Sequence, residues 1–115
     1  MYLIFDTETT GLPKNYNAPV SDSDNWPRMV QLAWQIHDKE GALVEVQNFI
    51  VKPEGYTIPF NASKIHGIST KRAKEQGVDL DYVLEEFNKA LAKVEYVVGH
   101  NIEFDVNIAG AEYFR

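Results

Sequence analysis

The stretch from Ile4 to Leu12 constrains this chain most, because an apolar segment runs directly into two carboxylates. Tyr2–Phe5 is apolar and typical of a β-strand, and Asp6 and Glu8 follow two positions apart. Side chains alternate along a strand, so both carboxylates are expected on one face. A divalent cation between them would remove their repulsion, and oxygen ligands suit Mg²⁺ or Mn²⁺. The pattern predicts a metal platform at a strand end, with an ordinary acidic turn as the alternative.

Composition limits the kinds of protein that this chain resembles. Its 115 residues suffice for one small domain, and the absence of cysteine excludes disulfides and thiolate metal sites. We expect a cytoplasmic protein, because no secretion leader and no apolar run of membrane-spanning length is visible. The net charge of −6 argues against a protein that coats nucleic-acid phosphates directly. It permits an enzyme that reaches phosphate through metal ions held by its acidic residues.

Three segments predict an antiparallel meander. The first strand covers Tyr2–Asp6, and Thr9, Thr10 and Gly11 end it. The second is the alternating segment Val30–Ile36, which a turn at Asp38–Gly41 joins to a third strand over Ala42–Val51. The polar segment Lys14–Pro27 is expected to be an exposed surface loop, with Trp26 folding back onto the body.

Helical patterns dominate the second half of the chain. Asn61 is expected to cap a short helix that ends before Gly67, Ser69 a helix over Thr70–Gln76, and Asp79 a longer helix. The longer helix carries an apolar stripe at helical spacing, formed by Val83, Leu84, Phe87, Ala90, Leu91 and Val94.

The segment Tyr96–Val98 predicts a short strand in a buried central position, parallel to an earlier strand because a helix precedes it. Asn101 is expected to cap a final helix from Ile102 to Arg115. The expected fold class is therefore α/β, a mixed sheet of three antiparallel strands plus a parallel central strand, with flanking helices. The final helix stops abruptly, so we expect a C-terminally truncated domain over residues 1–115.

A second acidic element begins the final helix. Asp105 lies one turn into it and shares a helical stripe with Asn101, Ile108 and Glu112. An aspartate in the first turn is also favoured by the helix dipole alone. The order of the elements, with an Asp-x-Glu strand first and an Asn-x-x-Phe-Asp helix start last, favours a functional pairing.

These motifs resemble the DnaQ-like (DEDD) superfamily of 3′–5′ exonucleases, and most closely the epsilon-type proofreading domain of bacterial DNA polymerase III. The resemblance rests on Asp6–Leu12, Pro59–Ser69 and Gly99–Asp105, which are similar to the first motif, an intermediate segment and the second motif of the family. It covers essentially the whole chain and implies an RNase H-like fold. The family's third motif, with a fourth carboxylate and a nearby His or Tyr, has no counterpart here.

The resemblance implies metal-dependent hydrolysis of phosphodiester bonds at nucleic-acid 3′ ends. Two Mg²⁺ or Mn²⁺ ions per complete site would stabilise the attacking and leaving oxygens. The catalytic and metal-binding residues would be Asp6, Glu8 and Asp105. The substrate-binding candidates are Thr7, Thr9, Thr10, Gly11, Leu12, His66, Asn101 and Phe104. Among these, backbone amides after the first strand would meet the 3′ hydroxyl, and Leu12 would contact the base. His66 resembles a nucleotide-lining position, and not the missing general base.

The implied partners are the single-stranded 3′ end of DNA or RNA and the subunits of DNA polymerase III, without a membrane. An RNA-trimming exonuclease is one alternative. Another is a catalytically incomplete fragment that binds nucleotides or docks on a polymerase. Such a fragment would bind Mn²⁺ weakly, show little or no turnover, and could form a homodimer. A different nuclease or phosphatase of the RNase H-like type is disfavoured by the loop at Thr9–Leu12.

Overall fold

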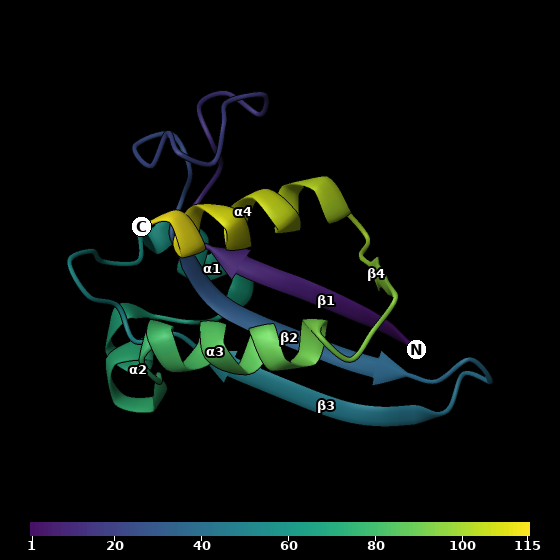
Figure 1. Ribbon diagram of the computed structural model, residues 1–115. Coiled ribbons are helices and arrows are strands. Elements are labelled where there is room, and N and C mark those ends of the chain that lie inside the picture. Colours follow the sequence, from purple (N-terminus) through teal and green to yellow (C-terminus); the bar gives the residue numbers. More distant parts are fainter.

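The fold is organised around a four-stranded sheet with the strand order β3-β2-β1-β4 (Figure 1). The computed structural model describes residues 1–115, and its strands are β1 (Tyr2–Thr9), β2 (Met29–His37), β3 (Leu43–Ile50) and β4 (Tyr96–Val98). The pairs β1–β2 and β2–β3 are antiparallel, whereas β1 and β4 are parallel. The predicted meander and the parallel pairing are therefore confirmed, and the sheet is mixed as expected for an α/β fold.

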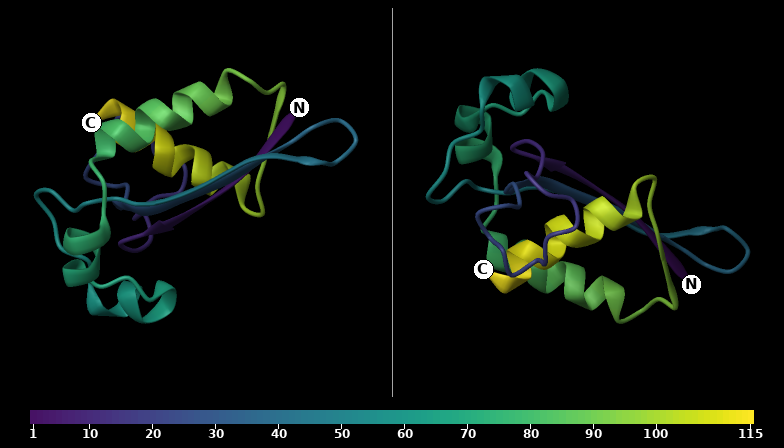
Figure 2. Two further views of the ribbon diagram at one scale, coloured as in Figure 1. Left: turned by 90° about the horizontal axis from the view of Figure 1, so that it is seen from below. Right: turned by 90° about the horizontal axis from the view of Figure 1, so that it is seen from above.

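Two helices cover one face of this sheet, α3 (Leu80–Leu91) and α4 (Ile102–Phe114) (Figure 2). The alternation in β1 buries Leu3 and Phe5 against them. The predicted stripe of α3 packs on the same core, with Val83, Leu84, Phe87 and Ala90 buried and Leu91 and Val94 partly buried. Burial of apolar side chains at about 25 cal/mol per Å² holds these two layers together.

The other two helices, α1 (Phe60–His66) and α2 (Thr70–Gln76), lie on the opposite side of the sheet, near the end of β1 (Figure 2). They have a small core of their own, formed by Val30, Ile58, Ala62, Ile68 and Ala73. Gly67 ends α1 with a φ of 78°, a left-handed conformation that favours glycine, and Ser69 caps α2 by accepting the Arg72 N–H at 3.1 Å. Both of these predictions are confirmed.

The predicted central position of the strand at Tyr96–Val98 is wrong. β4 lies at the edge of the sheet, and all three of its residues are exposed. An apolar run without alternation is typical of a strand covered on both faces. β4 pairs only with β1. The hydrophobic pattern therefore predicted that this segment is a strand, but it did not predict the position of the strand in the sheet.

Element boundaries also differ from the expected ones. β1 extends three residues beyond Asp6, because its ladder with β2 continues as far as Thr9 opposite Met29. The residue before α1 is Pro59, not Asn61, and it offers no side-chain cap. Asp79 and Asn101 do precede α3 and α4, but neither side chain accepts a capping hydrogen bond.

The loop between β1 and β2 packs closely on the body. Trp26 is 2% exposed, as the prediction that it folds back requires, and its indole N–H donates to the Pro19 carbonyl at 3.0 Å. Tyr16 packs against Phe104 of α4, with the two rings tilted and their centroids 6.4 Å apart. Most of the loop is exposed, as predicted, and it contacts α4 through Tyr16. None of the helices is both long and apolar enough to cross a membrane.

Glu45 on β3 accepts hydrogen bonds from two side chains. The buried indole of Trp34 donates to Glu45 Oε2 at 2.8 Å, and Lys93 donates to Oε1 at 3.0 Å. The Trp34 hydrogen bond and Lys93 hold the pKa of Glu45 below its ordinary value of 4.5. We expect Glu45→Ala to lower the free energy of unfolding by about 1 to 2 kcal/mol at pH 7, because the indole N–H loses its acceptor.

This difference should depend on pH. A carboxyl with a lowered pKa in the folded protein contributes stability above its unfolded pKa and loses it as pH falls through the folded pKa. Urea denaturation of both proteins between pH 7 and pH 3 should show the difference shrinking below about pH 4.5. Glu45→Gln, which keeps an acceptor, is the matched control. A difference that stays constant over this range would contradict the assignment.

Candidate active site

Asp6 and Glu8 project from one face of β1. The buried side chains of this strand are Leu3, Phe5, Thr7 and Thr9, so the two carboxylates lie on the face away from α3 and α4. Asp6 is exposed and Glu8 is half-buried. Neither takes part in an ion pair with another side chain. The predicted side-by-side arrangement on one strand face is thus present.

Asp105 reaches β1 from the other face. It lies in the first turn of α4 and is only 3% exposed, and its Oδ1 accepts a hydrogen bond from the Thr7 hydroxyl at 2.6 Å. This contact joins two residues 98 positions apart and fixes the start of α4 on β1. Thr7 was a substrate-binding candidate from the sequence, but its hydroxyl serves to hold Asp105 in place.

Two of the three carboxylates, Glu8 and Asp105, have pKa values raised by burial and by neighbouring negative charge. Burial raises the pKa of Glu8, and the negative charges of Asp6 and Asp105 raise it further, against a lowering effect of His66. Burial also raises the pKa of Asp105; the Thr7 hydrogen bond opposes this and the charge of Asp6 adds to it. The end of β1 therefore concentrates negative charge that no basic residue neutralises by direct pairing.

The three predicted ligands do not converge into a finished cage. No group of three or more His, Asp or Glu side chains lies close enough together to hold a metal ion. Asp6 and Glu8 share a strand face, whereas Asp105 is bonded to Thr7 between them on the opposite face. A cleft of about 730 Å³ lies elsewhere, between α3 and the end of α4, and none of the three carboxylates lines it.

The loop after β1 is held mainly by its own hydrogen bonds. The Thr9 hydroxyl donates to the Gly11 carbonyl at 2.7 Å, and the Thr10 N–H donates to the Arg28 carbonyl at 3.0 Å. The Gly11 N–H points at the Thr9 hydroxyl at 3.3 Å. These two amides are engaged within the protein, which leaves Leu12, 75% exposed, as the free apolar contact of the loop.

His66 connects α1 to this loop. Its Nδ1 accepts the Ile68 N–H at 3.1 Å, so Nε2 carries the proton and donates to the Thr9 carbonyl at 3.2 Å. Because both ring nitrogens are occupied by backbone groups, His66 is not placed as a general base. Its position beside the loop and its effect on Glu8 keep it at the edge of the site.

The last two candidates flank Asp105 on α4. Asn101 is exposed, and its carbonyl accepts the Asp105 N–H at 3.2 Å. Phe104 is half-buried under Tyr16. Both therefore lie beside the carboxylate, with Asn101 the more accessible of the two.

Comparison with known proteins places this geometry in a family. A family model described as "Exonuclease" (RNase T) matches residues 3–115. The chain belongs to this exonuclease family. It is 31% identical to the PolC-type DNA polymerase III of Streptococcus pneumoniae and 32% identical to that of Streptococcus thermophilus, each over 114 residues. These matches cover 99% of the chain but only 7% of each polymerase.

Solved structures support the same fold. Escherichia coli exonuclease I in complex with a dT13 oligonucleotide superimposes on this exonuclease domain with a TM-score of 0.75 and 23% identity, covering 94% of the domain and 22% of that chain. The DnaQ-like 3′–5′ exonuclease resemblance and the RNase H-like fold are thereby confirmed. These relatives are PolC-type DNA polymerases III, whereas the motifs most resemble the epsilon-type domain of DNA polymerase III.

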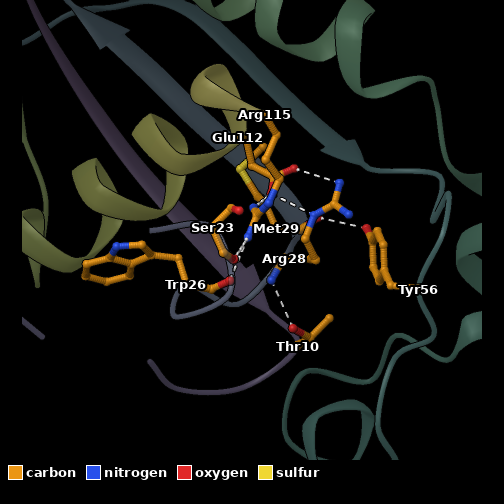
Figure 3. Close-up of polar contacts among 8 residues, drawn as sticks. All are labelled: Thr10, Ser23, Trp26, Arg28, Met29, Tyr56, Glu112 and Arg115. Atoms are coloured by element: carbon orange, nitrogen blue, oxygen red, sulfur yellow. Dashed lines mark hydrogen bonds and ion pairs between the residues drawn. The ribbon is translucent and has the colours of Figure 1, made fainter. Parts of the chain in front are cut away.

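One element of the exonuclease domain was not predicted from the sequence, a buried ionic network at the end of α4 (Figure 3). The Glu112 side chain is fully buried and accepts hydrogen bonds from Arg28 Nε at 2.9 Å and Nη2 at 3.3 Å, and from Arg115. The Arg28 guanidinium lies over the Tyr56 ring, 4.4 Å from its centroid. Burial raises the pKa of the Tyr56 phenol, which donates to the Met29 carbonyl.

Arg28 also holds the loop beside the carboxylates. Its N–H donates to the Thr10 hydroxyl at 3.0 Å, and its carbonyl accepts the Thr10 N–H. The end of α4 is thus attached to the loop after β1 through Glu112, Arg28 and Thr10 (Figure 3). Its first turn is attached to β1 itself by the Thr7–Asp105 hydrogen bond. From the sequence, this network is visible only as a glutamate, Glu112, on the helical stripe that also contains Asp105. Its partner Arg28 is 84 residues away, so no local pattern points to it.

Proposed function

We propose that this exonuclease domain removes nucleotides from the 3′ ends of nucleic acids by metal-dependent phosphodiester hydrolysis. The observation that carries the proposal is the pair Asp6 and Glu8 on one open face of β1, in a chain that matches the exonuclease family over residues 3–115. The superposition on exonuclease I supports the fold on which such a site is built.

The residues present fit a hard divalent cation by their chemistry. Two carboxylates without ionic partners stand side by side, and burial and the Asp6 charge raise the pKa of Glu8. The protein itself therefore does not offset their repulsion. Asp6 and Glu8 would hold Mg²⁺ or Mn²⁺, which when bound lowers the pKa of water and offsets charge on the phosphate. Asp105, bonded to Thr7, contributes its negative charge.

The remaining groups of the site would position the substrate. Leu12 is exposed next to the carboxylates and offers an apolar surface for the terminal base. The His66–Thr9 hydrogen bond keeps the loop and α1 together, so the edge of the nucleotide site has a fixed shape. The Thr7–Asp105 and Arg28–Thr10 contacts keep α4 and the loop in register with β1.

We further propose that the natural substrate is DNA and that the role is proofreading with DNA polymerase III. The support is the identity of 31% to 32% with PolC-type polymerases over nearly the whole chain. In those relatives the matching segment is a small part of a much longer polymerase. The protein partners of this exonuclease domain would accordingly be subunits of DNA polymerase III.

Hydrolysis of 5′-labelled oligonucleotides tests both parts of this proposal. Incubated with Mg²⁺ or Mn²⁺, the protein should shorten single-stranded DNA stepwise from the 3′ end, faster than RNA of the same sequence, and not in EDTA. Asp6→Ala and Glu8→Ala should each abolish the ladder. Shortening that survives both substitutions, or a ladder that starts at the 5′ end, would contradict the proposal. Faster cleavage of RNA would assign RNA trimming instead.

A further inference from the structure

Basic charge in this acidic protein is concentrated on α1 and α2. Between Phe60 and Gln76 there are four basic side chains and one acidic one, so this segment carries +3 within a chain of net charge −6. The four, Lys64, Lys71, Arg72 and Lys74, are all exposed and are called the basic surface below. None of them forms an ion pair with a carboxylate. Their positive charge is therefore free to meet an anion.

Apolar side chains are exposed on the same pair of helices. Phe60 is 77% exposed and Ile65 is 84% exposed, so both side chains are largely in solvent. Phe60 and Lys64 are four residues apart and share one face of α1, and Lys71 and Lys74 share one face of α2. An aromatic ring beside ammonium groups is the combination that binds single-stranded nucleic acid, by base stacking and phosphate contact.

The basic surface is rigidly attached to the protein. Ala62, Ile68 and Ala73 bury the inner sides of α1 and α2 against Val30 and Ile58. The Thr70 hydroxyl accepts the Ile58 N–H at 2.9 Å, and Arg72 donates to the Gly67 carbonyl at 3.2 Å. A strand that binds here would meet preformed contacts and would not have to order the helices.

The basic surface lies on the same side of the sheet as Asp6 and Glu8. α1 and α2 lie on the side of the sheet opposite α3 and α4, near the end of β1 (Figure 2), and this is the side to which Asp6 and Glu8 point. His66, at the end of α1, donates a hydrogen bond to the carbonyl of Thr9, the residue after Glu8, at 3.2 Å. The two helices that carry the basic surface thus lie on the same side of the sheet as the proposed cleavage site, and α1 contacts the end of β1 through His66.

We propose that the basic surface binds the body of a single-stranded polynucleotide while its 3′ end occupies the carboxylate site. Lys64, Lys71 and Lys74 contact successive phosphates, and Phe60 stacks on a base. This inference rests on the proposed function for the direction of the strand, but strand binding itself requires no hydrolysis. The complementarity is electrostatic, because the rest of the protein carries a net charge of −9 and repels the same strand.

The test is fluorescence anisotropy with a labelled oligothymidylate of about 20 nucleotides, long enough to span several phosphates, in EDTA to prevent cleavage, over a range of salt concentrations. The triple variant Lys64→Gln, Lys71→Gln, Lys74→Gln should bind at least about tenfold more weakly at low salt. The slope of log affinity against log salt should fall in magnitude by about 2, since each phosphate contact to a single strand contributes about 0.7. An oligouridylate arm measures whether the surface distinguishes RNA from DNA.

A matched control removes the same charge elsewhere. Lys39, Lys89 and Lys93 are also exposed and lie on the β2–β3 hairpin and around the end of α3. Their replacement by glutamine should change the affinity by less than about twofold, because they do not contact the strand. Equal weakening by the two triple variants, or no measurable binding by the unmodified protein at low salt, would overturn the proposal.

Phe60→Ala separates stacking from charge. We expect about tenfold weaker binding with an unchanged salt slope, because base stacking releases no counterions. An affinity equal to that of the unmodified protein would remove Phe60 from the surface.

Asp6→Ala distinguishes this inference from the proposed function. It should bind the oligonucleotide at least as tightly as the unmodified protein, because it removes a negative charge, while losing cleavage. Lysine-dependent binding without any cleavage would overturn only the proposed function. Cleavage that requires Asp6, together with unchanged binding by the lysine variant, would overturn only this inference.

Discussion

Replacing Arg28 by methionine is expected to destabilise the protein by about 3 kcal/mol, because it removes the main partner of a buried carboxylate. Glu112 has no exposed side-chain surface, and Arg28 provides two of its hydrogen bonds. Methionine keeps an apolar contact with the Tyr56 ring, so the loss of stability measures the removal of the positive charge of Arg28. Urea denaturation at pH 7 measures the difference, which corresponds to a melting temperature lower by about 10 °C or more for a domain of this size.

The control for this prediction replaces both partners. The double variant Arg28→Met, Glu112→Met should recover most of the stability, because an apolar pair of similar volume carries no desolvation penalty. Arg115 keeps its hydrogen bonds to the Ser23 and Trp26 carbonyls in this variant. If the double variant is as unstable as Arg28→Met alone, the loss comes from packing and the ionic interpretation is wrong.

Asp6→Asn is expected to have the largest effect on activity, reducing hydrolysis at least about a thousandfold, and to abolish stabilisation by metal. In the unmodified protein, Mn²⁺ at 100 times its dissociation constant should add about 2.7 kcal/mol to the free energy of unfolding. Asparagine removes one charge of the Asp6–Glu8 pair, which the cation is proposed to bridge. Thermal denaturation with and without Mn²⁺, alongside cleavage of labelled DNA, measures both effects.

The same substitution should leave the metal-free protein equally stable or more stable. Asp6 adds to the charge that raises the pKa of Glu8, so its removal relieves repulsion between the two side chains. Glu40→Gln, at an exposed position in the hairpin between β2 and β3, is the control that removes a charge away from the site. A Mn²⁺-dependent shift that persists in Asp6→Asn, or disappears in Glu40→Gln, would contradict a metal site at Asp6.

The sequence predicted those features that depend on short-range periodicity. Alternation along β1 is a local property of an extended chain, so it placed Asp6 and Glu8 on one face. The apolar stripe of α3 and the Ser69 cap of α2 depend on residues within one or two turns, and both are present. The motifs also led to the exonuclease family, which the comparisons confirmed.

Only the tertiary structure decided which distant groups meet. Asp105 bonds to Thr7 and Glu112 to Arg28, across 98 and 84 residues, and no local pattern specifies such pairs. The edge position of β4 likewise depends on which strand pairs with which, since an apolar segment satisfies more than one place in a sheet. The basic side chains of α1 and α2 are visible in the sequence, but packing on Val30 and Ile58 places these helices on the side of the sheet to which Asp6 and Glu8 point. Periodicity fixes how a segment folds, whereas the burial of its apolar face fixes where it lies.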